Sequence, residues 1–212
     1  FPAEFKTISD YCIANQHTDG SFIEIGHSTT PEESLESRKI RFTCFVLIAI
    51  LKNRDFIRKP YAEEIDRAFK FVESQIDYDN YAKSMCAYAS ALAGRNSTNQ
   101  LLEGLNRHGI TDGVIKYWEL ENGKNSSKGI QVLIASYAIL AYEASNHIEK
   151  VNPITRWLVQ QMNSKGEFLD SYSNAVAIEA LTTMTEKSVD TSIDVEFVNL
   201  DVKKKVNVNN EN

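Results

Sequence analysis

The side chains that most often carry out chemistry are sparse in this chain and poorly spaced for it. The sequence contains three cysteines and four histidines, and no two cysteines have the spacing of metal ligands. Each cysteine falls on an apolar position of an expected helix, which predicts small buried side chains. Pairing of one of them with a cysteine outside this chain is the alternative. The residues are Cys12, Cys44 and Cys86, with His17, His27, His108 and His147.

Three of the histidines, His17, His108 and His147, have no carboxylate or cysteine at a useful spacing. His108 precedes Gly109 in the last turn of an expected helix, where a cation would interact favourably with the helix dipole. The sequence contains no phosphate-binding loop, dinucleotide fingerprint, HExxH motif or serine-centred elbow. We therefore predict no metal site, no cofactor and no enzymatic activity.

Two sequons for N-linked glycosylation fall in expected loops. They are Asn96-Ser97-Thr98 and Asn125-Ser126-Ser127. Because a glycan requires an exposed asparagine in a secreted chain, these triplets predict a glycoprotein modified at Asn96 or Asn125.

Composition restricts the class of protein further. The chain has 212 residues, with 23 basic and 29 acidic side chains, and its hydrophobic content of 42% is that of an ordinary globular domain. A net charge of −6 without a basic stripe argues against a nucleic-acid partner. The longest nearly apolar run, 42–51, is about half the roughly 20 residues needed to span a bilayer. The first residue is Phe1, so we interpret the chain as a fragment.

Apolar spacing predicts an all-α fold in which two kinds of helix alternate. Amphipathic helices are expected at 4–15, 60–75, 97–108 and 152–162, and helices apolar on all sides at 41–52, 81–93, 131–144 and 172–184. The second kind must be enclosed by other helices. Ser97 and Gln100 fit a capping box, while Asn152 and Pro153 fit an N-cap and a first helical residue.

Two turns of similar sequence follow amphipathic helices, at 16–22 and 161–168. Each has a glutamine, a tight glycine turn and a phenylalanine that re-enters the core, which indicates one structural unit used twice. The alternation predicts an α/α toroid with an inner ring of enclosed helices and an outer amphipathic ring. A closed ring needs roughly twelve helices, so we expect the first third of it to be missing.

The period changes near the end of the chain. Ile193, Val195 and Phe197 alternate with polar residues, and valines continue the alternation to Val208. We therefore divide the chain into a partial toroid domain, 1–188, and the first β-strands of a second, CUB-like β-sandwich, 189–212.

Several blocks of sequence resemble the thioester domain of the alpha-2-macroglobulin and complement family. They occur in the family's order between about Phe5 and Thr185, and the low cysteine content is nearest to the insect thioester-containing proteins. The blocks are 19–22, 42–49, 81–94, 117–118, 135–142 and 151–158. The resemblance implies the α/α toroid fold and assigns the β tail to the family's CUB domain.

The family's chemistry needs a Cys–Gln thioester within a Gly-Cys-Gly-Glu-Gln motif, and this chain does not contain one. The resemblance places that motif on the first helices of the ring, in the third that we expect to be missing. Some relatives also use a histidine, which attacks the thioester and frees the cysteine thiolate as a base. Since His27 follows the Asp19-Gly20-Ser21-Phe22 turn, it is the candidate for this acyl transfer; a solvated loop histidine is the alternative.

The resemblance implies a secreted, extracellular factor of innate immunity that acts as a complement-like opsonin. After proteolytic activation it would bind microbial surfaces or immune protein partners, and it would pack against the CUB and macroglobulin domains of its own protein. One alternative is a protease inhibitor of the alpha-2-macroglobulin type. A more remote alternative is an α/α-toroid terpene cyclase or prenyltransferase, although the acidic or zinc motifs of those enzymes are not visible in the sequence.

Overall fold

The computed structural model describes residues 2–22, 35–56, 61–75, 78–121, 126–187, 193–199 and 202–208. These residues form eight α-helices, two short 3-10 helices and four strands. The α-helices are α1 (Pro2–Ala14), α2 (Leu35–Lys52), α3 (Ala62–Ser74), α4 (Asn80–Leu92), α5 (Ser97–Arg107), α6 (Lys128–Ala144), α7 (Val151–Val159) and α8 (Ser171–Lys187). The 3-10 helices are η1 (Arg54–Phe56) and η2 (Ile148–Lys150). No helix within these ranges is both long and apolar enough to cross a membrane.

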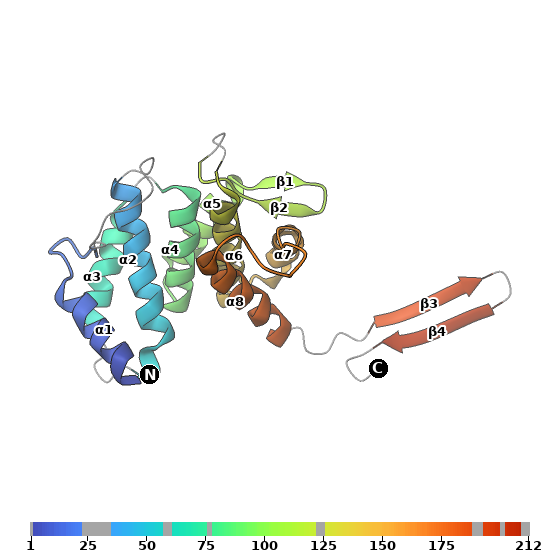
Figure 1. Cartoon of the computed structure of the whole chain (residues 1–212), viewed down its shortest axis with the longest axis horizontal. Helices are drawn as coiled ribbons and strands as arrows, with labels where there is room; N and C mark the ends of the chain where they lie inside the picture. Colours follow the sequence, from blue (N-terminus) through green and yellow to red (C-terminus); the bar gives the residue numbers. More distant parts are fainter. Residues whose placement is uncertain are drawn as a thin grey trace.

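The even-numbered helices form an inner row, in the order α2, α4, α6 and α8 (Figure 1). Each packs along the next, and the contact between α4 and α6 is the most extensive. The odd-numbered helices α3, α5 and α7 lie against α2, α4 and α6 respectively, as an outer layer. The alternation of amphipathic and enclosed helices predicted from the sequence therefore corresponds to two layers of helices.

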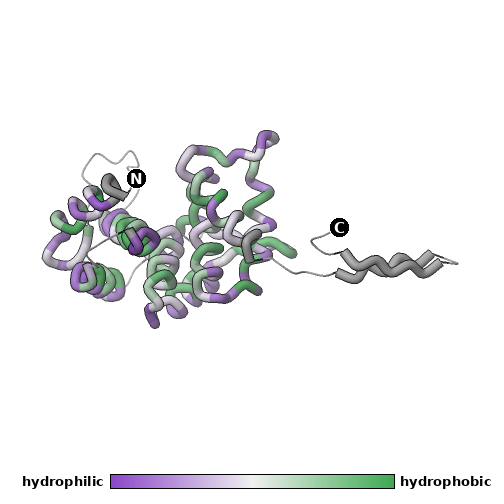
Figure 2. Tube along the Cα trace, turned by 90° about the horizontal axis from the view of Figure 1, so that it is seen from below, coloured by the Kyte–Doolittle hydropathy of each residue, from purple (hydrophilic) through white to green (hydrophobic). Residues whose placement is uncertain are grey.

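Apolar surface explains this arrangement. Every residue of α6 from Gln131 to Glu143 is buried, because α4, α7 and α8 surround it. The outer helices bury one face only, as α3 does with Phe69 and Val72. Along the helices in Figure 2, hydrophobic stretches of the tube alternate with hydrophilic ones. Trp118, in the connection after α5, is fully buried and donates from its indole nitrogen to the Leu105 carbonyl at 2.7 Å.

The prediction that the last inner helix is enclosed was wrong. In α8, Val176 and Ala180 are buried, but the Ile178 side chain is 48% exposed. The reason is that α8 is the last helix of the row, so α6 covers only one of its sides. Phe45 of α2, at the other end of the row, is also partly exposed, and its ring meets the ring of Tyr172 edge-on.

The cysteines were predicted to be buried and not bonded to one another. Burial is confirmed for Cys44 and Cys86, but these two residues are bonded. Cys44 of α2 and Cys86 of α4 are fully buried and form a disulfide, with a Cα–Cα distance of 5.1 Å. The two residues are 42 positions apart, and they meet because neighbouring inner helices pack side by side. Cys12 in α1 is a half-buried free thiol.

Two helix starts differ from the prediction. The capping box does not form, because the Ser97 hydroxyl donates to the Glu73 carboxylate at 2.9 Å instead of capping α5. Helix α7 begins at Val151 with Lys150 as its N-cap residue, ahead of the predicted Asn152. The predicted stop after α4 is confirmed, since Gly94 has a positive φ of 64°.

Two antiparallel hairpins complete the chain. β1 (Ile110–Asp112) pairs with β2 (Ile115–Tyr117) through a two-residue turn whose first residue, Gly113, has a φ of 58°. This hairpin was not predicted, although Asp112-Gly113 is a known turn signal. β3 (Ile193–Asn199) pairs with β4 (Val202–Val208), which confirms strands in the C-terminal tail.

Candidate functional site: the turn that leads to His27

The turn after α1 holds the chain in place just before the segment that contains His27. The His17 amide donates to the Ser21 carbonyl and the Gly20 amide donates to the His17 carbonyl, both at 2.9 Å. Gly20 has a φ of 92°, and a Cβ atom there would lie 2.2 Å from the carbonyl oxygen of Arg67 in α3. Only glycine fits this position, because both the backbone conformation and the close approach to α3 exclude a side chain.

Gln16 ties the turn to α3 through its side-chain amide. The amide nitrogen donates to the Gly20 carbonyl at 2.9 Å and to the Glu64 carbonyl at 2.8 Å. The amide oxygen accepts from the Arg67 guanidinium at 2.7 Å. The glutamine noted in the sequence thus connects two elements that are 48 residues apart.

Asp19 organises the opposite side of the turn. Its carboxylate accepts from the Ser21 amide at 2.9 Å, from the Ser21 hydroxyl at 2.6 Å and from the Lys39 ammonium of α2 at 2.7 Å. Burial disfavours the charged form, but the hydrogen bonds from Lys39 and Ser21 outweigh burial and hold the pKa of Asp19 at about 2. The carboxylate is therefore ionised at neutral pH.

Phe22 ends the turn inside the core, with only 3% of its surface exposed. Its amide donates to the hydroxyl of Thr43 in α2 at 3.0 Å. Thr43 was not singled out in the sequence, where it stands as one polar residue within an apolar run. His27 itself lies outside the described residues. The structure defines the position of Phe22, from which the segment with His27 continues.

The second turn, 163–168, repeats this geometry. The Asn163 amide donates to the Glu167 carbonyl at 2.9 Å, and the Gly166 amide donates to the Asn163 carbonyl at 3.0 Å. Gly166 has a φ of 78°, and Phe168 is buried with its amide donating to the Asn174 side chain at 3.2 Å. The prediction of one structural unit used twice is confirmed for the glycine turn and the phenylalanine, but not for the glutamine, because the Gln161 side chain donates to the Trp157 carbonyl at 3.1 Å and not to the turn.

Both turns lie beside inner helices: the first is bonded to Lys39 and Thr43 of α2, and the second to Asn174 of α8. The starts of these helices also lie close to one another: the Asn80 amide donates to the Leu120 carbonyl, just ahead of α6. A Cβ atom on Gly129, in the first turn of α6, would lie 2.9 Å from the Asp170 carboxylate ahead of α8. The starts of α6 and α8 therefore lie together, and the partial positive charge of helix N-termini favours an anion.

Tyrosine side chains connect the inner helices. The Tyr137 and Tyr172 hydroxyls are 2.7 Å apart. Burial, followed by the proximity of Tyr172, raises the pKa of Tyr137 well above its usual range. The Arg41 guanidinium lies over the Tyr81 ring, 5.0 Å from its centre. These contacts link α6 to α8 and α2 to α4.

The other predicted site residues lie elsewhere. Asn96 is exposed at the start of α5, while Asn125 lies outside the described residues. The expectation of a cationic His108 was wrong: burial, Lys83 and Arg107 lower the pKa of His108. Its Nδ1 atom lies 3.3 Å from the Lys83 ammonium. Within the described ranges, no three His, Cys, Asp or Glu side chains group closely enough to hold a metal ion.

Comparison with known proteins gives one consistent result. Residues 2–184 match the sequence profile of the A-macroglobulin TED domain. The chain is 28% identical over 183 residues to thioester-containing protein 1, alleles S3 and S1, of Anopheles gambiae, and 28% identical over 181 residues to allele R1. Each alignment covers 84% of this chain and 13% of the relative, so the chain spans a small part of the length of these curated relatives.

Proposed function

The chain belongs to the A-macroglobulin TED domain family, and from that premise we propose that it is part of a secreted, complement-like thioester protein of innate immunity. Proteolytic activation would expose this domain, which then attaches to microbial surfaces as an opsonin or binds immune protein partners. The attachment is a single covalent event rather than turnover, so the protein is not an enzyme.

The observation that carries this proposal is the anchored turn before His27. Gly20 fits closely against α3 and Phe22 is fixed to Thr43 of α2, so the following segment departs from a fixed position beside α2. We place the thioester within reach of that segment. His27 would attack the thioester carbonyl to form an acyl-imidazole, and the released cysteine thiolate would remove the proton of an incoming hydroxyl. Loss of the imidazole would then complete the ester.

Extracellular localisation is supported by the cysteine chemistry. Disulfides persist in oxidising compartments and are rare in the cytosol, and Cys44 is bonded to Cys86 in the core. The exposed Asn96 begins a sequon, and Asn125 begins a second one. We propose that the mature protein is a glycoprotein modified at one or both of these residues.

We also propose that the two-layer row of helices is part of a closed α/α toroid. In α8, the last helix of the row, the Ile178 side chain is 48% exposed. Further helices of the same protein would cover it. The hairpin of β3 and β4 would then be the first strands of a CUB domain, and macroglobulin domains would be the other intramolecular partners.

The experiment is a mass measurement on the full-length protein before and after treatment with methylamine. We expect one methylamine adduct on a glutamine outside this chain and one new free thiol. His27→Ala should keep the adduct but transfer less acyl group to glycerol, whereas His17→Ala, in the turn that precedes His27, should transfer as much as the wild type. Absence of both the adduct and the thiol would overturn the covalent function, and equal transfer by His27→Ala would remove His27 from it.

A further inference from the structure

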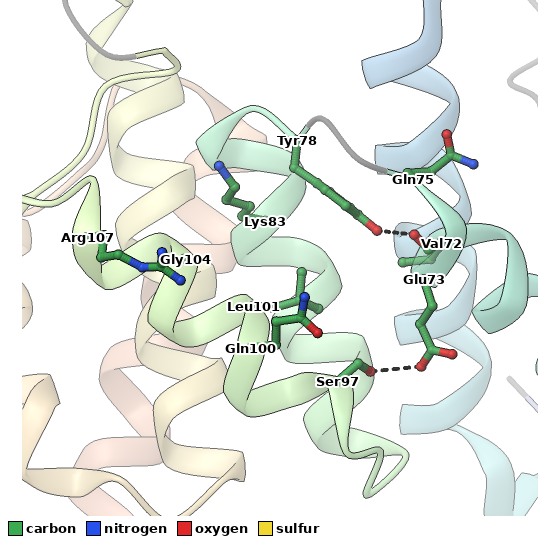
Figure 3. Close-up of a pocket in the computed structure, with 10 residues that line it drawn as sticks. All are labelled: Val72, Glu73, Gln75, Tyr78, Lys83, Ser97, Gln100, Leu101, Gly104 and Arg107. Carbon is green, nitrogen blue, oxygen red and sulfur yellow. Dashed lines mark hydrogen bonds between the residues drawn. The ribbon is translucent and has the colours of Figure 1, made fainter.

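A groove with a volume of about 280 Å³ lies on the outer layer, between the end of α3, the start of α4 and the length of α5 (Figure 3). It is separate from the turn that leads to His27. Lys83 and Arg107 lie toward one end and Glu73 lies at the other, with the Tyr78 ring and Leu101 between them. We call this feature the cationic groove; its size suits a ligand or side chain of roughly amino-acid dimensions.

The positive end of the groove has unused binding capacity. The Arg107 Nε atom donates weakly to the Glu103 carbonyl of its own helix, at 3.4 Å. Its two terminal nitrogens have no hydrogen-bond partner within the part of the chain that the structure describes. The positive charge also affects the neighbouring His108: burial lowers the pKa of its imidazole most, and the charges of Lys83 and Arg107 lower it further. This end attracts an anion although the chain as a whole carries a charge of −6.

The acid at the far end does not neutralise these cations, because its charge is already paired. The Glu73 carboxylate accepts two hydrogen bonds from Arg95, both at 3.0 Å, and one from Ser97 at 2.9 Å. Between the two ends, the Tyr78 hydroxyl donates to the Val72 carbonyl. The phenol is therefore satisfied, and its ring offers an apolar wall.

Gly104 forms part of the groove at the middle of α5. Its φ is helical, and a Cβ atom there would come no closer than 4.0 Å to the Lys83 side chain. Neither backbone conformation nor packing therefore requires glycine, although glycine weakens a helix interior relative to alanine. What the missing side chain provides is open space beside Lys83 and Arg107.

We propose that the cationic groove binds a carboxylate carried on a small apolar body, namely an acidic side chain of a protein next to an apolar residue. A guanidinium with free terminal nitrogens pairs with a planar carboxylate through two parallel hydrogen bonds, and the lysine adds a point charge. A carboxylate fits better than a phosphate dianion, because Arg107 lies in the last turn of α5, where the helix dipole is negative. Tyr78 and Leu101 contact the apolar body.

The test is calorimetric titration of the full-length protein with four probes: acetyl-Leu-Glu-Leu-amide, its Gln and phosphoserine counterparts, and N-acetylneuraminate. We expect saturable 1:1 binding of the Glu peptide, and binding of each of the other three at least tenfold weaker. Failure of the Glu peptide to saturate, or tighter binding of the phosphoserine peptide or of N-acetylneuraminate, would overturn the proposal.

Variants separate a built site from general electrostatic attraction. Arg107→Gln and Lys83→Gln should each weaken binding tenfold or more, while Lys165→Gln, an equal charge loss on an exposed turn, should change it less than twofold. Gly104→Ala should raise the thermal midpoint and yet weaken binding. Equal losses for Lys165→Gln and Arg107→Gln, or unchanged binding by Gly104→Ala, would refute the assignment of the groove.

Discussion

Removal of the disulfide between α2 and α4 should destabilise the protein strongly. In the chain-entropy description, a cross-link restricts the unfolded chain more as the loop it closes becomes longer. Cys44 and Cys86 are 42 residues apart, and a loop of that length corresponds to about 4 kcal/mol at 25 °C. Both residues are fully buried, so replacement by alanine also loses packing, which acts in the same direction.

The assay is urea unfolding of the double variant Cys44→Ala/Cys86→Ala, followed by circular dichroism at 222 nm. With a denaturant slope of about 2 kcal/mol per molar, the midpoint should fall by about 2 M. The matched control is Cys12→Ala, which removes a half-buried free thiol and should shift the midpoint much less. The reasoning would be refuted if the midpoint of the double variant decreased by less than about 0.5 M. Recovery of unlinked Cys44 and Cys86 peptides from the native protein would refute it as well.

Three further predictions concern single residues. Gly20→Ala should cost more than about 2 kcal/mol in the free energy of unfolding, since the Cβ atom would lie 2.2 Å from a backbone oxygen of α3; Gly166→Ala, whose Cβ atom would meet nothing within 4 Å, should cost less in the same urea titration. The pKa of Asp19 is lowered from 3.8 to about 2, so its stabilising contribution is complete above about pH 4 and lost as the pH falls toward 2. Unfolding between pH 2 and 5 should therefore show a steeper loss for the wild type than for Asp19→Asn, and parallel curves would contradict the assignment. Asn96→Gln should remove one glycan from the secreted protein, so the variant should have a lower mass than the wild type, and this difference should disappear when both are deglycosylated. Equal masses before deglycosylation would mean that Asn96 is unmodified.

Helix positions were predictable from the sequence because burial leaves a periodic pattern. The enclosed helices α4 and α6 were located within a few residues, since apolar side chains on all sides require neighbours on all sides. Tertiary context set the exceptions. Whether α8 is enclosed depends on how many helices stand beside it, and a helix start depends on competing partners, as when Ser97 binds Glu73 instead of capping α5.

The turn before His27 was predictable in kind but not in its partners. A glycine turn and a re-entering phenylalanine, repeated once, indicated a tight anchored unit, and both copies have the expected hydrogen bonds. The contacts that fix it come from Lys39, Thr43 and Arg67, which lie 20, 21 and 51 residues from the groups they bind. Local spacing carries no information about such neighbours, and the same limit explains why the Cys44–Cys86 pair was missed.

The two matching turns bear on how this protein can change over time. Each is specified by little more than a glycine in the left-handed region and a buried phenylalanine, Gly20 with Phe22 and Gly166 with Phe168. Each also needs one acceptor for the phenylalanine amide, Thr43 for Phe22 and Asn174 for Phe168. The connections that follow differ in length, 23–34 ahead of α2 and 169–170 ahead of α8. The same anchor therefore tolerates connections of different length, and the connection can change while the helices stay in place.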